Sequence, residues 1–319
     1  MSRSIIPTLR SLGKLLTGGK VVSSREAERL RAALDASESR SAQLRDELAA
    51  SRHELEIFRR EKREMQPFFP AIYGHAMHVD PLDAGHRFAA LDGAKPEHGE
   101  AGYIVRNVSV GQTVLDIGAN VGLYTLLLAR QVGTTGRVIA FEPGPKSYSL
   151  LVQNIALNGY TNVCAENVAV SERAGTVDLY VCRTGESDNR IAGTLNPTDN
   201  WDKMSIRSID IDTYLDQNGI AEVDFIKMDI QGAELFALRG MEQTLRRSPN
   251  VQMIMEYSPN GLSFTGASAA SVLADFERGG FRLFVVPEGE DEVPTTSRWL
   301  LDNIGGHMQP PQTNLLLRR

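Results

Sequence analysis

The sequence predicts an α/β fold with a mainly parallel, doubly wound sheet over residues 111–319. Apolar runs of strand length alternate with helical segments from residue 113 to the end of the chain. Runs such as 113–115 and 224–226 also lack a regular polar alternation. Such runs are typical of strands that are buried on both faces, as in parallel sheets.

The individual elements follow from hydrophobic periodicity, taken in chain order. Strands are expected at 113–117, 137–141, 162–168, 223–228, 251–256, 281–286 and 313–317. Helices are expected at 121–131, 145–157, 232–246 and 268–278. We find no internal repeat, so the region is interpreted as one domain.

The N-terminal part of the chain has a different pattern. Residues 1–22 form a basic amphipathic segment, which we interpret either as a frayed terminus or as a contact to a membrane surface or partner. Residues 23–66 lack Gly and Pro from 24 to 64, and their apolar residues alternate at spacings of four and three, which predicts a long helix. Serines interrupt this seam, so a coiled coil that joins copies of the chain and a helix lying on its own domain both stay open. Residues 67–110 lead into the main domain.

Composition limits the class of protein. The chain has 319 residues, 42% hydrophobic and 23% charged, with a net charge of -6, which is typical of a globular protein and does not favour a nucleic-acid partner. Cys164 and Cys182 form no CxxC pair, so neither a disulfide framework nor a cysteine-based zinc site is expected. Because no apolar run is long enough to cross a bilayer, we expect a cytoplasmic protein, with residues 1–20 as a candidate contact to the inner face of the membrane.

The most informative motif is the segment 114–122, in which an apolar strand ends in glycine turns and leads into a helix. Such a turn brings backbone amides close to a ligand. A dinucleotide site would require the pattern GxGxxG, with a middle glycine that lets the chain approach a pyrophosphate. The sequence from Gly118 to Gly122 lacks that glycine, which disfavours a dinucleotide-dependent oxidoreductase.

Two acidic residues end consecutive predicted strands. Asp116 lies at the end of the first strand, and Glu142 ends the second, about 20 residues beyond Gly122, where the ribose of a nucleoside is expected. The two carboxylate oxygens of Glu142 can accept both ribose hydroxyls. Carboxylates at these positions favour a cofactor that has no phosphates and carries positive charge.

Several spaced motifs resemble the FkbM-type methyltransferases, and the resemblance extends over most of residues 77–319. The motifs are 116–122, 141–143, 151–159, 167–170 with Gly175, 211–215, 224–234 and 238–240. One departure is Gln231, where the family usually has Glu. A role that needs a charge at this position is therefore in doubt, whereas a hydrogen-bonding role is not.

The resemblance implies a Rossmann-like sheet of seven strands with a reversed last strand, of the class I methyltransferase type. It also implies S-adenosylmethionine as cofactor and a hydroxyl on a sugar, lipid or secondary metabolite as methyl acceptor, with 67–110 on the acceptor side. The residues expected to bind the cofactor are Asp116, Gly118, Asn120, Gly122, Glu142, Pro143, Asn167 and Val168. Besides the oxidoreductase, a non-catalytic assembly protein on the same fold stays an alternative.

The candidate catalytic residues lie near the end of the strand 223–228 and its neighbour. Asp229 is the first choice for a general base, and Lys227 shares its side of the strand by period-two alternation. Glu234 and Glu256 would complete an acidic rim, although each could instead be a solvated acid at an element end. Such a group of carboxylates could hold a divalent metal, but its spacing does not indicate one, so no metal is expected.

Two further segments are candidates for the acceptor site. His75, His78, His86 and His98 lie together in 71–100, and one of them could line the acceptor pocket. Residues 183–201 form a long polar stretch, which we interpret as a cover over the acceptor, with Trp201 as a stacking surface or a packing anchor.

Overall fold

A computed structural model describes most of the C-terminal part of the chain and a short stretch near its N-terminus. The described residues are 25, 29, 31–41, 43–44, 71–79, 99–182, 189–191, 201–264, 266, 268–287, 290–304 and 312–319. The chain divides into two compact units, Met1–Gln66 and Pro67–Arg319. In the first unit residues 31–41 are helical and exposed, within the range predicted as a long helix. The predicted basic segment 1–22 and the later half of the heptad seam lie outside the described residues.

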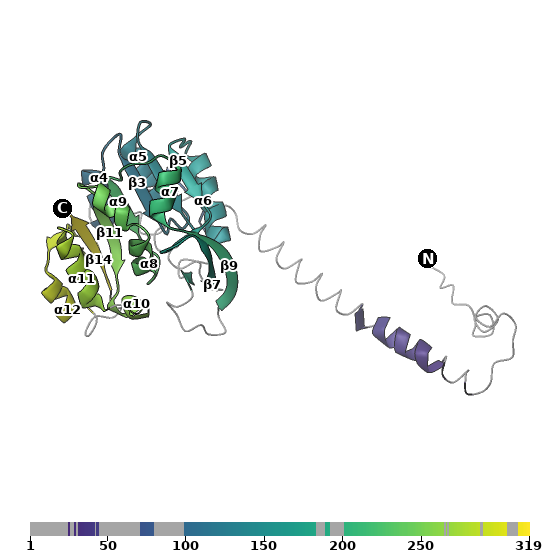
Figure 1. The fold of residues 1–319 in the computed structure, drawn as a ribbon. Coiled ribbons are helices and arrows are strands. Elements are labelled where there is room, and N and C mark those ends of the chain that lie inside the picture. Colours follow the sequence, from purple (N-terminus) through teal and green to yellow (C-terminus); the bar gives the residue numbers. More distant parts are fainter. Residues whose placement is uncertain are drawn as a thin grey trace. The chain divides into compact units, whose positions relative to one another are not determined.

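The second unit is built on an eight-stranded sheet with the order β13-β12-β14-β11-β10-β3-β4-β5. Figure 1 labels β14, β11, β3 and β5 of this sheet. The strands are β3 (Thr113–Ile117), β4 (Arg137–Phe141), β5 (Val163–Glu166), β10 (Phe225–Met228), β11 (Gln252–Tyr257), β12 (Arg282–Val286), β13 (Val293–Pro294) and β14 (Thr313–Arg318). From β11 to β5 every neighbouring pair is parallel. β14 runs antiparallel to both β11 and β12. The predicted mainly parallel sheet with a reversed last strand is therefore confirmed, and the two-residue β13 adds an eighth strand.

Helices cover both faces of this sheet. They are α4 (Gly99–Asn107), α5 (Leu123–Val132), α6 (Pro145–Leu157), α7 (Ile211–Gln217), α8 (Glu234–Arg239), α9 (Glu242–Arg247), α10 (Pro259–Phe264), α11 (Ala269–Arg278) and α12 (Ser297–Asn303). Tyr103 of α4 and Leu128 of α5 pack with Val114 of β3. Leu215 of α7 and Leu273 of α11 pack with the next residue of β3, Leu115, which faces the other way. The sheet is thus doubly wound, as predicted.

Three parts of the predicted element list are wrong. The expected helix 232–246 is two helices, α8 and α9, because the chain turns at Gly240, where a Cβ would lie 2.1 Å from the carbonyl oxygen of Ser171. The expected strand 162–168 ends at Glu166, and the chain then joins a second sheet. That sheet has the order β6-β9-β7-β8, with β6 (Ala169–Val170), β7 (Gly175–Cys182), β8 (Arg190–Ile191) and β9 (Trp201–Ile209). Neither α4 nor α7 nor this second sheet was among the predicted elements.

A short hairpin precedes the main domain, formed by β1 (Ala71–Ile72) and β2 (His75–Ala76). Within the described parts of the chain, no helix combines the length and the apolar character that crossing a membrane requires.

Candidate active site

The turn after β3 packs directly against the end of β10. Gly118 has φ +85, and a Cβ on this residue would lie 1.9 Å from the carbonyl oxygen of Asp229. Only glycine avoids both the strain and the clash. The backbone amides of Gly118 and Ala119 both donate to the carbonyl oxygen of Phe141, at 2.9 and 3.0 Å. The motif glycine therefore brings the ends of three neighbouring strands, β4, β3 and β10, together.

Glu142 ties the turns after β3 and β4 to each other. Its Oε2 accepts a hydrogen bond from the amide of Asn120 at 2.7 Å, and its Oε1 accepts one from the amide of Gly144 at 2.7 Å. The side chain of Asn167, which follows β5, donates to the carbonyl oxygens of Glu142 and Pro143. Hydrogen bonds to charged groups are among the stronger ones. Four of the predicted cofactor residues thus hold three neighbouring loops in one arrangement.

A cavity opens at these loop ends. It is lined by Ile117, Gly118, Asn120, Phe141, Glu142, Pro143, Val168, Ala169, Val170, Leu179, Asn189, Ile191, Asp229, Ile230 and Gln231. Five of the predicted cofactor residues are among them, whereas Asp116, Gly122 and Asn167 are not. Leu179 and Ile191 of the second sheet form a wall of this cavity that the sequence motifs did not predict. The alternation of polar and apolar residues in 176–181 is the signal that could have indicated this strand.

Asp116 is buried on the face of the sheet that α4 and α5 cover. Its Oδ2 accepts a hydrogen bond from Thr125 Oγ1 of α5 at 2.5 Å. Burial raises the pKa of Asp116 to about 6, although the hydrogen bond from Thr125 and the positive charge of Lys227 lower it. A buried carboxylate of this kind is stabilised by an additional positive charge, so its environment suits a cationic ligand.

Lys227 lies beside Asp116 on the same face, because the two residues are register partners in β10 and β3. Its side chain is 2% exposed, and its Nζ lies 3.2 Å from Glu100 Oε1 of α4 and 3.9 Å from Asp229 Oδ2. Burial alone would lower the pKa of Lys227, but the negative charges of Glu100, Asp229 and Asp116 outweigh it and raise the pKa. Lys227 therefore pairs with Asp229, as predicted, although Glu100 is nearer.

Asp229 is the most accessible acid of this group. Its side chain is 44% exposed and lines the cavity. Its amide donates to the carbonyl oxygen of Ile117, and its Oδ1 accepts a hydrogen bond from Gln231 Nε2 at 2.9 Å. Gln231 adopts φ +54, which is uncommon for a residue other than glycine. A glutamine amide can make this contact, whereas an ionised glutamate here would repel Asp229.

Glu234 and Glu256 are buried. Glu234 is the first residue of α8, and its Oε1 accepts hydrogen bonds from the amides of Ile230 and Gly232, both at 3.2 Å. Burial raises the pKa of Glu234 to about 7. Glu256 is buried in β11, opposite Asn314 of β14. The interpretation of either residue as a solvated acid is wrong, and neither lines the cavity, so the described rim contains Asp229 but not these two acids.

The other candidate acceptor residues lie elsewhere or outside the described residues. The ring of His75 contacts the hydroxyl of Tyr160 at 2.6 Å, and burial lowers its pKa to about 4. Neither His75 nor His78 lines the cavity. His86, His98 and most of 183–200 lie outside the described residues. Trp201 is the first residue of β9, opposite Cys182 of β7.

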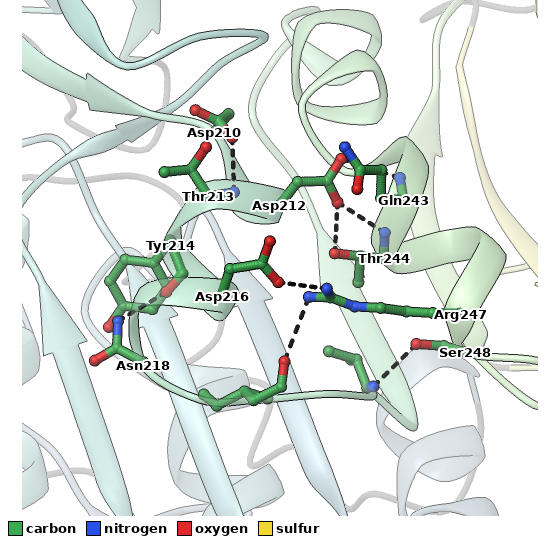
Figure 2. Close-up of polar contacts among 12 residues, drawn as sticks. Asp210, Asp212, Thr213, Tyr214, Asp216, Asn218, Gln243, Thr244, Arg247 and Ser248 are labelled. Carbon is green, nitrogen blue, oxygen red and sulfur yellow. Dashed lines mark hydrogen bonds and ion pairs between the residues drawn. The ribbon is translucent and has the colours of Figure 1, made fainter.

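The motif 211–215 belongs to a structural contact between α7 and α9, shown in Figure 2. Asp212 accepts hydrogen bonds from the amides of Gln243 and Thr244, at 3.0 and 2.7 Å, and from Thr244 Oγ1 at 2.7 Å. Arg247 of α9 forms an ion pair with Asp216 at the end of α7. Asp212 thus satisfies free amides at the start of α9 and has no contact with the cavity.

Comparison with known proteins matches residues 116–283 to the family described as "Methyltransferase FkbM domain". The chain is 27% identical over 188 residues to the "Methyltransferase sdnD" of Sordaria araneosa, which covers 50% of this chain and 72% of that protein. It is 25% identical over 148 residues to the "2-O-methyltransferase NoeI" of Sinorhizobium fredii, covering 42% of this chain and 59% of that one. It is 24% identical over 131 residues to the "Hexuronic acid methyltransferase AglP" of Haloferax volcanii, covering 41% of this chain and 50% of that one.

The chain therefore belongs to the FkbM methyltransferase family, and its cofactor is S-adenosylmethionine. The residues present fit such a group by their chemistry. Glu142 provides carboxylate oxygens at the cavity. Asp116 does not line the cavity, but it provides a buried negative charge two residues before Gly118, which does. The lining is otherwise mainly apolar on the side of the second sheet, as a nucleobase requires.

Proposed function

From its membership in the FkbM methyltransferase family, we propose that this protein methylates a hydroxyl group on a sugar-like or secondary-metabolite acceptor. When bound, S-adenosylmethionine supplies an activated methyl group. The protein then has to align the acceptor oxygen, exclude water and remove one proton. Each of these tasks can be given to residues at the cavity.

The observation that carries the proposal is the position of Asp229. It is a partly exposed carboxylate at the cavity, and Gln231 fixes its Oδ1. Its Oδ2 is the atom nearer to Lys227 Nζ, at 3.9 Å, which is longer than a hydrogen bond. Oδ2 is thus the oxygen we propose as acceptor of the hydroxyl proton. Such a base suits a neutral hydroxyl, which must lose its proton as it attacks the methyl carbon.

The roles proposed for the cofactor site follow from charge. Asp116 is buried and does not line the cavity, so it would act on the cationic methionine end through its charge. Glu142 would accept hydrogen bonds from the ribose while it keeps its two backbone donors. Pro143 and Val168 would pack against the adenine ring of the cofactor, together with Leu179 and Ile191 of the second sheet. Lys227 is too deeply buried to touch an acceptor, so we give it an electrostatic role.

The names of two relatives support the choice of acceptor. NoeI is described as a 2-O-methyltransferase and AglP as a hexuronic acid methyltransferase. Both names indicate oxygen or sugar chemistry for those proteins. No observation favours either the oxidoreductase or the non-catalytic assembly protein as a second function.

Transfer of an isotope-labelled methyl group from S-adenosylmethionine tests the proposal. The acceptor panel contains neutral sugar glycosides, uronic acid glycosides, a polyhydroxylated metabolite and, for comparison, simple amines. We expect label in a product that is stable to mild alkali, since a methyl ether survives it and a methyl ester does not. The variant Asp229→Asn should reduce this transfer by roughly 100-fold or more. Labelling of amines alone, or unchanged transfer by Asp229→Asn, would contradict the proposal.

A further inference from the structure

Helix α4 brings an acidic side chain to the candidate site from outside the segment 116–283 that matches the family. Glu100 lies in the first turn of this helix. One of its carboxylate oxygens, Oε1, lies 3.2 Å from Lys227 Nζ, and the other, Oε2, accepts a hydrogen bond from the Tyr124 hydroxyl at 2.8 Å. Neither sequence motifs nor the family match indicated this residue.

The ammonium of Lys227 is enclosed by groups from four elements. Glu100 belongs to α4, Tyr124 to α5, Asp116 to β3 and Asp229 follows β10. The Nζ atom also lies 5.0 Å from the centre of the Tyr124 ring, within the range of a cation–π contact. Glu256 of the next strand, β11, lies on the same face of the sheet by register. Among the described residues, the site therefore contains one buried cation, Lys227, and several acids around it.

The choice of partner by Lys227 decides how far the lysine neutralises the negative charge of the other acids. A buried ammonium needs a nearby anion, because burying an unpaired charge is costly. Without Glu100, Asp229 and Asp116 would be the remaining acids to meet this need, and the lysine would neutralise them. With Glu100 at 3.2 Å and Asp229 at 3.9 Å, the closest partner is an acid that does not line the cavity.

We propose that Glu100 is a positioning residue that pairs with the Lys227 ammonium, so that the lysine does not neutralise the negative charges of Asp116 and Asp229 and these stay available to cofactor and acceptor. This inference rests on the proposed function, because it assumes that these two carboxylates serve the methyl transfer. If Glu100 has this role, α4 contributes a side chain to the site in addition to covering the sheet.

The two members of the ion pair act on Asp116 in opposite directions. Burial is the largest contribution to the raised pKa of Asp116, the positive charge of Lys227 lowers this pKa, and the negative charge of Glu100 raises it. Loss of the Glu100 charge should therefore lower the pKa of Asp116, and loss of the Lys227 charge should raise it. A residue that only supported the fold would not produce this pair of opposite shifts.

The test is the titration of Asp116 in the full chain without cofactor, followed by nuclear magnetic resonance of isotope-labelled aspartate carboxyl groups. The Asp116 signal is identified by its loss in Asp116→Asn. We expect the midpoint of this titration to fall by about one pH unit in Glu100→Gln and to rise by about one unit in Lys227→Met. Glu100→Asp keeps the charge and should leave the midpoint closer to that of the wild type. Glu242→Gln, an exposed site on α9, is the matched control and should shift nothing.

Calorimetry with S-adenosylmethionine between about pH 5 and pH 8 supplies an independent readout. Affinity should fall as Asp116 becomes protonated, and the pH of half loss should move in the same directions as the titration midpoints. If Glu100→Gln does not fold, Lys227→Met decides the matter, with a shift to higher pH expected. A midpoint equal to that of the wild type in folded Glu100→Gln, or in Lys227→Met where Glu100→Gln does not fold, would overturn the role of Glu100. Absence of S-adenosylmethionine binding by the wild type would instead contradict the proposed function, while the titration would still test the ion pair.

Discussion

Acidic side chains have different partners in two regions of this protein, the strand ends around Asp116 and the contact between α7 and α9. At the contact, Asp212 accepts three hydrogen bonds from backbone and hydroxyl donors of α9 (Figure 2). At the strand ends, Asp116 accepts a hydrogen bond from Thr125 and otherwise interacts with charges, and burial raises its pKa to about 6. We therefore expect the carboxylate with neutral donors to stabilise the fold, and the one held among charges to carry a free-energy cost that a cationic ligand would offset.

The largest expected change in the free energy of unfolding comes from substituting one glycine in each region. Gly118→Ala should lower the free energy of unfolding by at least about 3 kcal/mol, because the new Cβ would lie 1.9 Å from the Asp229 carbonyl oxygen and φ is +85. The control is Gly219→Ala, just after α7, with φ +67 and no atom within 4 Å of the added Cβ. It should cost about 1 kcal/mol, from strain alone. Chemical denaturation measures both, and equal costs would show that the strand ends are not packed as described.

A smaller effect is expected from removal of the carboxylate at the helical contact. Asp212→Ala should lower the free energy of unfolding by about 2 to 3 kcal/mol, since it leaves amides at the start of α9 without their acceptor. S-adenosylmethionine affinity should not change. Asp216→Ala removes an exposed partner of Arg247 and should cost less than about 1 kcal/mol. A loss of affinity in Asp212→Ala at constant stability would mean that the motif 211–215 serves the site.

Removal of the Asp116 carboxylate at the strand ends should raise the free energy of unfolding, whereas removal of the Asp212 carboxylate should lower it. The pKa of Asp116 is raised from 3.8 to about 6, so the cost of its charge in the folded state is absent below pH 3.8, grows as pH rises and is complete above about pH 6. Asp116→Asn should therefore stabilise the protein without cofactor by about 1 to 2 kcal/mol at pH 8 and have no such effect at acidic pH. Thermal unfolding at both pH values measures it. Destabilisation at pH 8 would contradict the proposed cost.

The smallest effect is expected from the first unit of the chain. Deletion of residues 1–66 should leave S-adenosylmethionine affinity unchanged, because Pro67–Arg319 forms a compact unit that contains every residue of the candidate site. Light scattering and sedimentation with anionic lipid vesicles, with the full chain and the truncated chain compared, test the proposed self-association and membrane contact. If both chains are monomers and neither sediments with vesicles, these two roles are wrong.

Sequence alone predicted the parts of the fold that local pattern determines. The ends of β3 and β4, with Asp116 and Glu142, lie side by side because parallel strands share a carboxyl edge. The glycine motif fixes the turn between β3 and α5. Contacts between distant segments have no such local signature. Glu100 reaches Lys227 from 127 residues away, and nothing in the sequence near Glu100 marks it. The second sheet was missed because β7 and β9 flank the polar stretch 183–201, which was interpreted as one long loop although it contains β8 and the first residue of β9.

An acidic residue near a strand end was not by itself enough to predict a residue of the cavity. Glu234 and Asp229 are both acids near the end of β10, yet Glu234 is buried and holds amides of its own turn, whereas Asp229 lines the cavity. The difference depends on the turn at Gln231 and Gly232, whose backbones have positive φ. Hydrophobic periodicity does not indicate a turn with positive φ. The two acids were therefore predicted to lie together in one acidic rim.

Calorimetry of cofactor binding with Glu142→Ala tests the central claim, that the strand ends hold S-adenosylmethionine, most directly. The wild type should bind S-adenosylmethionine and not NAD, and Glu142→Ala should bind it at least roughly 10-fold more weakly, from the loss of hydrogen bonds to a charged group. The matched control is Glu166→Ala at the end of the neighbouring strand β5, whose carboxylate accepts from Tyr214 and does not line the cavity. Its affinity should equal that of the wild type. Unchanged affinity in a folded Glu142→Ala variant, or tighter binding of NAD, would contradict the account.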